Sequence, residues 1–367
     1  MSTYTLTQLL TNKSALQQSR ITHSEQDATL AAGEVLLKIR RCAITTNNIT
    51  YAAFGDSMQY WQFFPTGIQG WGHMPVWGFA DVIASAADGV AVGERFYGYF
   101  PIASHIRMLA ERVTQRGFYD SSAHRRVLVS AYNQYTRCSN DAVYEERLEN
   151  YQMLVRPLFI TSFMLADFLQ DNAFFGAQRL VISSASSKTA YGTAFCLQDY
   201  PQVELVALTS ERNRGFVEGL GCYRHTVSYE QLEQQPLDRP TLYVDFSGDT
   251  GLRARVHHHY GEALVYDCFA GSAQNTEVPS DAGLPGPTPA FYFAPVQIRK
   301  RNADWGPDLV NQRFNAAQSS FIRHISDPRH LWMEVAEEQG FAAAQELISN
   351  LHEGKIDPQQ GRVISLA

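Results

Sequence analysis

The sequence predicts an α/β protein with two domains, an antiparallel β domain followed by a doubly wound parallel sheet with helices on both faces. Short extended segments separated by glycine and polar turns fill residues 33–100, which is typical of antiparallel strands. From about residue 154, long apolar helices alternate with buried strands, which is typical of βαβ units. A chain of 367 residues is also longer than one hydrophobic core usually supports.

Composition and charge indicate a globular protein with much buried surface. Hydrophobic residues make up 45% of the chain, charged residues make up 18%, and the net charge is −7. The lysine and arginine residues are dispersed, which argues against binding to nucleic acid. The longest apolar segment, 154–169, carries Arg156, Pro157 and Asp167 and therefore predicts a buried helix and no membrane span. Five scattered cysteines predict neither a disulfide framework nor a structural zinc site, and they fit a reducing cytoplasm.

The most informative segment runs from a buried strand, Leu180 to Ser183, through small residues into a helix. Such a turn lets the backbone approach a phosphate, and the amides at the start of the helix point at it. The motif G-x-G-x-x-G is absent, so hydroxyl groups and one ammonium would have to bind the pyrophosphate. Two alternatives remain open: a tight connection without a ligand, and a Lys188 side chain that blocks the pyrophosphate. The candidate residues are Ser184, Ala185, Ser186, Ser187, Lys188 and Thr189.

A second apolar strand within residues 203–213 ends where dinucleotide-binding folds meet the adenosine ribose. Ser210, Arg212 and Asn213 offer hydrogen-bond donors and positive charge there, which favours a 2′-phosphate and hence NADP over NAD. Further apolar strands begin near residues 241 and 263, at spacings that leave room for helices between them. Together these strands predict a parallel sheet.

Several segments carry a resemblance to a known family, most clearly GEVLLKIRRCAITTNNITYAAFGD (33–56), PVWGFADVIASAADGVAVGERFYGY (75–99) and FYFAP (291–295) followed by KRNADWG. With the order of the predicted domains, they resemble the medium-chain dehydrogenase/reductase superfamily. Within it, the chain is similar to the zinc-free quinone oxidoreductases and enoyl reductases, and more narrowly to a divergent bacterial family of uncharacterised members.

The resemblance implies a particular division of the chain. A GroES-like substrate domain would span 1–153, with a divergent insertion at 101–150. A Rossmann NADP-binding domain would span 154–290, and the C-terminal segment, 291–367, would return to the first domain. The resemblance also implies a homodimer built through edge strands of the nucleotide domain.

Site residues follow from the same resemblance. Asn47 and Tyr51 match an Asn and a Tyr that lie beside the nicotinamide in zinc-free quinone reductases, and Tyr51 is the candidate proton or hydrogen-bond donor. Thr45 and the triplet 78–80 stand where zinc-dependent relatives carry metal ligands, so no metal is expected. The remaining cofactor contacts that the resemblance implies are Thr161, Tyr229, Phe246, Ser247, Ala270, Phe291 and Phe293.

An aromatic run at residues 58–77 predicts an apolar substrate pocket beside Tyr51. The alternative is that these side chains cover the core or a subunit contact. His73 lies within the run, either as a proton donor or as a structural residue. The candidate pocket residues are Tyr60, Trp61, Phe64 and Trp71. Elsewhere, three consecutive histidines at 257–259 are expected on a helix, where they cannot share one metal ion well.

The residues and the resemblance together predict an NADPH-dependent, metal-independent reductase in the cytoplasm. Its substrate would be an apolar carbonyl compound, either a quinone or an α,β-unsaturated ketone or thioester. The alternative is a cofactor-free binding or scaffold protein that keeps the reductase fold.

Overall fold

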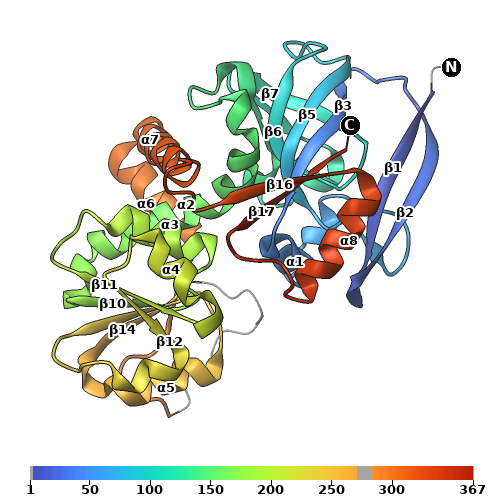
Figure 1. Ribbon diagram of the computed structural model, residues 1–367. Coiled ribbons are helices and arrows are strands. Elements are labelled where there is room, and N and C mark those ends of the chain that lie inside the picture. The colour runs from blue at the N-terminus through green and yellow to red at the C-terminus, as the bar shows by residue number, and fades with distance from the viewer. Residues whose placement is uncertain (1–2, 271–282, 367) are drawn as a thin grey trace. The chain divides into compact units, whose positions relative to one another are not determined.

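The computed structural model describes residues 3–270 and 283–366, and it confirms the predicted fold class (Figure 1). The chain forms two compact units, the first made of residues 1–154 and 335–367 and the second of residues 155–334. The return to the first unit therefore begins at residue 335, and the expected start at 291 differs from the structure. The reason is that residues 291–334 form part of a strand and two helices that belong to the second unit.

Six strands of the first unit close into a barrel, because β7 pairs with both β8 and β3. Closure leaves these strands no free edge. Going round the barrel, they are β3 (Glu34–Ile44), β5 (Val76–Ser85), β6 (Arg95–Phe100), β9 (Gln134–Arg137), β8 (Gly117–Asp120) and β7 (His105–Thr114). The segment 101–150, expected as a divergent insertion, thus supplies three barrel strands.

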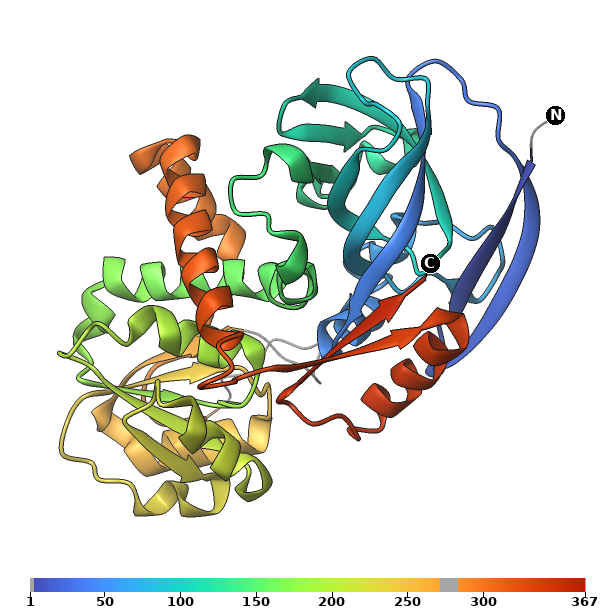
Figure 2. The same ribbon diagram turned by 45° about the horizontal axis from the view of Figure 1, so that its top comes forward.

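Two C-terminal strands extend this sheet beyond β3, and they are β16 (Glu334–Gln339) and β17 (Gln360–Ser365). A separate sheet joins β1 (Thr3–Asn12), β2 (Ala15–Asp27) and β4 (Trp71–Gly72). Helix α8 (Gly340–His352) lies beside β2 (Figure 2). Apolar side chains from the barrel, β1 and α8 share one core.

The second unit is a six-stranded, wholly parallel sheet in the order β12-β11-β10-β13-β14-β15. The sheet strands are β10 (Arg179–Ile182), β11 (Glu204–Thr209), β12 (His225–Ser228), β13 (Thr241–Asp245), β14 (Leu264–Phe269) and β15 (Ala290–Phe291). The helices are α3 (Lys188–Leu197), α4 (Arg214–Leu220), α5 (Thr250–Tyr260), α6 (Ala294–Trp305) and α7 (Pro307–Ile325). The strands predicted near residues 180, 203, 241 and 263 are confirmed as β10, β11, β13 and β14, whereas β12 was not predicted.

Helices cover both faces of this parallel sheet. Val206 and Leu208 of β11 pack with α5, whereas Ala207 packs with α4. Neighbouring residues of a strand point to opposite faces, so α4 and α5 lie on opposite sides of the sheet, as Figure 1 shows. Both faces of the sheet are therefore buried, which explains why its strands read as continuous apolar runs.

Helix α2 (Glu149–Asp171) spans the boundary between the two units. Residues Glu146–Asp171 are the one described segment long and apolar enough to cross a membrane, and 56% of its most apolar window is buried. Core helices pass the same test, so this is weak support for a membrane span. Its Asp167 accepts a hydrogen bond from Arg301 of α6 at 2.6 Å, as expected of a helix packed in a protein interior.

Candidate functional sites

The turn after β10 has the backbone of a phosphate-binding turn without its glycines. Ser184 has φ +46°, a left-handed conformation in which glycine is the usual residue. Ser187 then caps α3, because its hydroxyl accepts a hydrogen bond from the Ala190 amide at 3.3 Å. The other amides of a first helical turn lack intrahelical acceptors, and the helix dipole there favours an anion. Lys188 is half-buried at the first position of α3, and Thr189 follows it.

Two of the predicted cofactor residues lie directly on this turn. The phenol oxygen of Tyr229 accepts a hydrogen bond from the Ser184 amide at 3.2 Å. The side-chain amide of Asn213 donates to the Ser186 hydroxyl at 3.1 Å. Burial raises the pKa of Tyr229, so its phenol is neutral at physiological pH. The structure thus brings together Tyr229, Asn213 and the serine turn from three different strand ends.

A buried carboxylate, Asp245 at the end of β13, connects this turn to the neighbouring strand. Its Oδ1 accepts hydrogen bonds from the Ser183 hydroxyl at 2.7 Å and from the Ser247 amide at 2.8 Å. The Phe246 amide in turn donates to the Ser183 hydroxyl at 2.9 Å, and the Ala270 amide donates to the Asp245 carbonyl at 3.0 Å. Phe246, Ser247 and Ala270 are therefore held together at the edge of the sheet where β13 and β14 end.

Ser183 and Asp245 are not among the site residues that the sequence predicts. The signal was an ionisable residue at the end of a wholly apolar strand, where a buried carboxylate must have partners. Asp245 also forms an ion pair with Arg253 at 2.6 Å, and both side chains are fully buried. Because one carboxylate binds the Ser183 hydroxyl, the Ser247 amide and the Arg253 guanidinium, this edge of the sheet is rigidly built.

The histidines at 257–259 serve separate contacts. His257 Nε2 is 2.7 Å from the Asp267 carboxylate, and its Nδ1 is 2.7 Å from the Pro285 carbonyl. His259 Nε2 is instead 3.0 Å from the carbonyl of Gln235. Within residues 3–270 and 283–366, no group of three or more His, Cys, Asp or Glu side chains is arranged to hold a metal ion.

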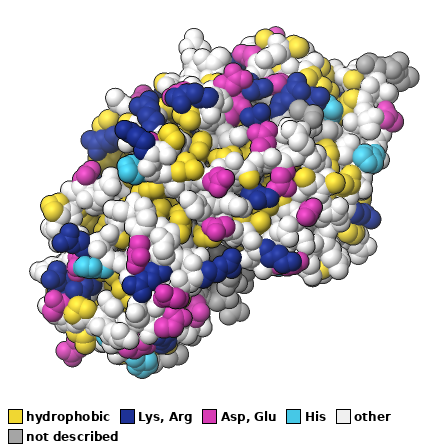
Figure 3. All heavy atoms as spheres, in the orientation of Figure 1, with side chains coloured by type: hydrophobic (Ala, Val, Ile, Leu, Met, Phe, Trp, Pro, Cys, Tyr) yellow, Lys and Arg dark blue, Asp and Glu magenta, His cyan; other side chains and the backbone are white. Residues whose placement is uncertain are grey.

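The end of β11 presents an exposed cation, Arg212. Within the described ranges no carboxylate forms an ion pair with it, whereas Arg214 is held by Glu218 at 2.9 Å. Glu211, which sequence reasoning passed over, is exposed beside them and lies 3.8 Å from Arg214. Residues Glu211–Asn213 form a short helical turn, and Ser210 precedes it in an extended conformation. Positive and negative side chains are interspersed on the face drawn in Figure 3.

Other predicted cofactor residues occupy less specific positions. Thr161 is half-buried on α2, but its neighbour Ser162 is the residue that donates a hydrogen bond to the Thr189 carbonyl, at 2.8 Å. Helix α3 comes this close because Gly192 has no side chain there: a Cβ at that position would lie 2.8 Å from the Ser162 hydroxyl. Phe291 and Phe293 are 58% and 45% exposed, and their rings are stacked at 6.2 Å.

In the first unit, Asn47 and Tyr51 lie one turn apart on α1 (Thr46–Ala53). This helix begins where the Asn48 side chain accepts a hydrogen bond from the Thr45 amide at 2.6 Å and donates to the Pro75 carbonyl at 2.8 Å. Trp77 Nε1 donates a hydrogen bond to the Tyr51 phenol oxygen at 3.1 Å.

Burial raises the pKa of Tyr51 well above that of a free phenol. Hydrogen bonds from Trp77, Asn47 and Tyr132 oppose this rise without reversing it. The phenol is therefore protonated at neutral pH, which is the state that a hydrogen-bond or proton donor requires.

Tyr51 is part of a dense group of aromatic side chains that we call the phenol cluster. Two of the predicted pocket residues belong to it: the Tyr60 ring lies 4.8 Å from the Tyr51 ring, and Phe64 lies 5.8 Å from Tyr99. The cluster consists of Tyr51, Tyr60, Phe63, Phe64, Tyr99 and Leu128, with Trp77 and Tyr132 packed against it. The cluster is thus an apolar group of aromatic rings that also contains the hydroxyl groups of several tyrosines.

The other two predicted pocket residues lie outside the phenol cluster. Trp61 belongs to the barrel core, because Gly55 and Gly72 leave room for its indole: a Cβ at these positions would lie 1.9 Å and 2.4 Å from that ring. Trp71 lies on β4, where the Arg20 guanidinium covers its ring at 4.1 Å. His73 is buried next to Gln8, which fits its structural alternative.

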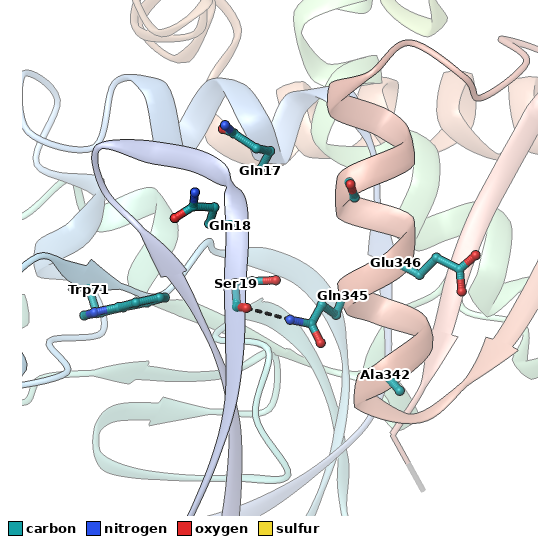
Figure 4. A pocket seen from close by; sticks show the side chains of 8 residues that line it. Gln17, Gln18, Ser19, Trp71, Ala342, Gln345 and Glu346 are labelled. Atoms are coloured by element: carbon teal, nitrogen blue, oxygen red, sulfur yellow. Dashed lines mark hydrogen bonds between the residues drawn. The ribbon is translucent and has the colours of Figure 1, made fainter.

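Trp71 also borders a shallow depression between β2 and α8, where Gln345 donates a hydrogen bond to the Ser19 carbonyl at 2.6 Å (Figure 4). Amide and hydroxyl side chains dominate its lining, which does not suit an apolar substrate. The lining residues are Gln17, Gln18, Ser19, Trp71, Ala342, Gln345, Glu346 and Ser349.

Several solved structures are similar to this chain over nearly their whole length. CurA from Vibrio vulnificus in complex with NADPH is 14% identical, with a TM-score of 0.58 over 94% of both chains. The CurK enoyl reductase is 12% identical, with a TM-score of 0.55 over 99% of both chains. The complex of Etr1p with NADP and crotonyl-CoA is 11% identical, with a TM-score of 0.55 over 99% of this chain and 100% of that one.

At these identities the likeness establishes the fold alone, which is the two-unit fold that the sequence resemblance implied. The chain belongs to the family described as "Protein of unknown function (DUF2855)", whose model matches residues 42–357. A search of curated proteins finds no relative.

Proposed function

We propose that this protein binds NADPH in its second unit and uses it to reduce an apolar α,β-unsaturated ketone or thioester, or a quinone, without a metal ion. The observation that carries the proposal is the left-handed turn at Ser184, followed by a capped helix. Arg212 at the next strand end adds an exposed guanidinium that no carboxylate of residues 3–270 and 283–366 pairs with. Structures of the same fold in complex with NADPH, or with NADP and crotonyl-CoA, support the choice of cofactor and substrate class.

The donor groups of the second unit fit a dinucleotide with a 2′-phosphate. Ser186, Ser187 and Thr189 offer hydroxyl groups, and Lys188 offers a compact ammonium, to a pyrophosphate at the start of α3. Arg212 offers a guanidinium to the 2′-phosphate. The bound cofactor would supply a hydride from its nicotinamide ring.

Tyr51 would act on the substrate oxygen. When hydride adds to the β-carbon of an enone, the double-bond electrons move to the carbonyl oxygen, which becomes an enolate. The Tyr51 hydroxyl would donate a hydrogen bond and then its proton to that oxygen, and ketonisation gives the saturated ketone. The overall reaction consumes one enone, one NADPH and one proton and yields the ketone and NADP⁺. Tyr60 and Phe64 would provide apolar contact for the substrate.

NADPH consumption with a panel of apolar enones and quinones tests the proposal, with product identified by mass. We expect activity with at least one compound, and Tyr51→Phe should lower kcat about 100-fold, the usual weight of one general acid. Tyr119→Phe is the matched control, because Tyr119 is a barrel tyrosine on β8 outside the phenol cluster. Failure of every compound, or equal kcat for Tyr51→Phe and the wild type, would refute the proposal.

A second candidate function is a cofactor-free binding protein with the same fold. Two observations favour it. The Ser184 amide already donates its hydrogen bond to the Tyr229 phenol, and Lys188 lies at the start of α3, near positions where dinucleotide-binding folds usually have glycine. Direct NADPH binding separates the two candidates, because a cofactor-free protein gives no saturable signal.

A further inference from the structure

A second phenol, Tyr132, reaches the phenol cluster from a segment that sequence analysis left without a role. Its hydroxyl lies 3.1 Å from the Tyr60 hydroxyl. The Tyr132 ring lies 4.7 Å from the Tyr99 ring and 6.1 Å from the Tyr51 ring. Three phenols from α1, a short turn at Tyr60–Gln62 and the segment before β9 therefore meet at one point.

A buried guanidinium fixes the position of Tyr132. Arg125, with no exposed surface, donates hydrogen bonds to the Tyr132 carbonyl at 2.7 Å and to the Asn133 side chain at 2.8 Å. Asn133 returns a hydrogen bond to the Arg125 carbonyl at 2.9 Å, and Asp120 lies 3.3 Å from the guanidinium. A buried charge is tolerated only with such a set of partners, so this segment has one defined conformation.

The directions of the hydrogen bonds leave the Tyr51 proton available. Indole Nε1 is only a donor, so Tyr51 accepts from Trp77 and its own O–H points elsewhere. Tyr51 and Tyr60 are 6% and 7% exposed, whereas Tyr132 is half-buried and so has more contact with solvent than either.

Burial raises the pKa of both Tyr51 and Tyr132, and a hydrogen bond from Tyr132 works against that rise at Tyr51. The other ionisable groups that face these phenols are Tyr60, Tyr99 and the Arg125–Asp120 pair.

We propose that Tyr132 is the proton-relay residue that reprotonates Tyr51 after each turnover. This inference deepens the proposed function and rests on it. After Tyr51 has given its proton to the enolate oxygen, the Tyr132 O–H proton passes to the Tyr51 phenolate, and Tyr132 takes a proton from water at its solvent-facing side. One proton from solvent thus replaces the proton that enters the product, and no oxidant or reductant beyond NADPH is involved.

Multiple-turnover kinetics of Tyr132→Phe test the relay, with Tyr119→Phe as the matched control. We expect the first turnover of Tyr132→Phe to stay within about twofold of the wild type, because Tyr51 begins protonated. Later turnovers should slow about tenfold or more, which gives a burst of one NADPH per chain. Tyr119→Phe should show neither effect.

A proton inventory of the wild type tests the relay independently of how any variant folds. Two protons in flight predict a curved dependence of kcat on the deuterium fraction of the solvent, and one proton predicts a straight line. A straight line, or wild-type turnover by a folded Tyr132→Phe variant, would overturn the relay and leave the proposed function standing. A wild type that consumes no NADPH with any enone or quinone would refute the proposed function itself, and the relay with it.

Discussion

Replacing Arg212 with alanine should separate NADPH from NADH. Arg212 is exposed at the end of β11 and has no ion-pair partner in the described part of the chain, so its loss breaks no ion pair there. A charge-assisted hydrogen bond to phosphate contributes about 1.5–3 kcal/mol, and solvent screening at this exposed site favours the lower end. NADPH affinity should therefore fall about 10- to 30-fold, and NADH affinity, which involves no 2′-phosphate, should stay within about twofold.

The assay is a fluorescence titration of the purified variant with each nucleotide, repeated at two salt concentrations. Arg214→Ala is the control, because Glu218 already engages that guanidinium at 2.9 Å. It should weaken NADPH binding by no more than about threefold, in keeping with the small contribution of an exposed paired charge. If Arg212→Ala weakens NADPH and NADH equally, or weakens neither, the assignment of the 2′-phosphate site is refuted.

Two further predictions concern stability. Ser184→Gly should raise the free energy of unfolding by up to about 1 kcal/mol, because glycine adopts the left-handed conformation at φ +46° without strain. Ser187→Ala should lower the free energy of unfolding by about 1 kcal/mol, because the cap of α3 is lost. Chemical denaturation measures both changes, and a destabilised Ser184→Gly variant would contradict the strain at Ser184. Burial lowers the pKa of His73 from 6.5 to about 4, so between these values the unfolded chain binds a proton that the folded protein does not. The free energy of unfolding should fall by about 3 kcal/mol as the pH drops through that window, and His73→Gln should remove this part of the slope; an unchanged slope would show that His73 is not its source.

Much of the fold could be predicted from hydrophobic patterning. The strands of the parallel sheet are buried on both faces, so each appears as an apolar run of the right length. The return of the chain was harder to place, because residues 330–354 have an apolar pattern that predicts one helix. In the structure, residues 334–339 of this segment form β16, and the helix begins only at Gly340. Gly340 has φ +83°, so the chain changes direction between the strand and the helix.

The candidate site was predictable where one element sets the geometry and not where several do. Asn47 and Tyr51 share a helix, so their spacing of four residues already places them together. Trp61 follows Tyr60 directly in a tight turn, and only the glycines at 55 and 72 decide that its indole enters the barrel core. Tyr132 joins the phenol cluster through the buried contacts of Arg125, which no local pattern reveals.

Calorimetric titration with NADPH tests the central claim most directly, namely that a turn of serines and one lysine binds the diphosphate of a dinucleotide. The account predicts saturable binding at one site per chain, weakened at least about tenfold by Lys188→Met, which removes the ammonium but keeps most of the aliphatic side chain. Absence of binding at millimolar NADPH, or undiminished binding by Lys188→Met, would contradict it.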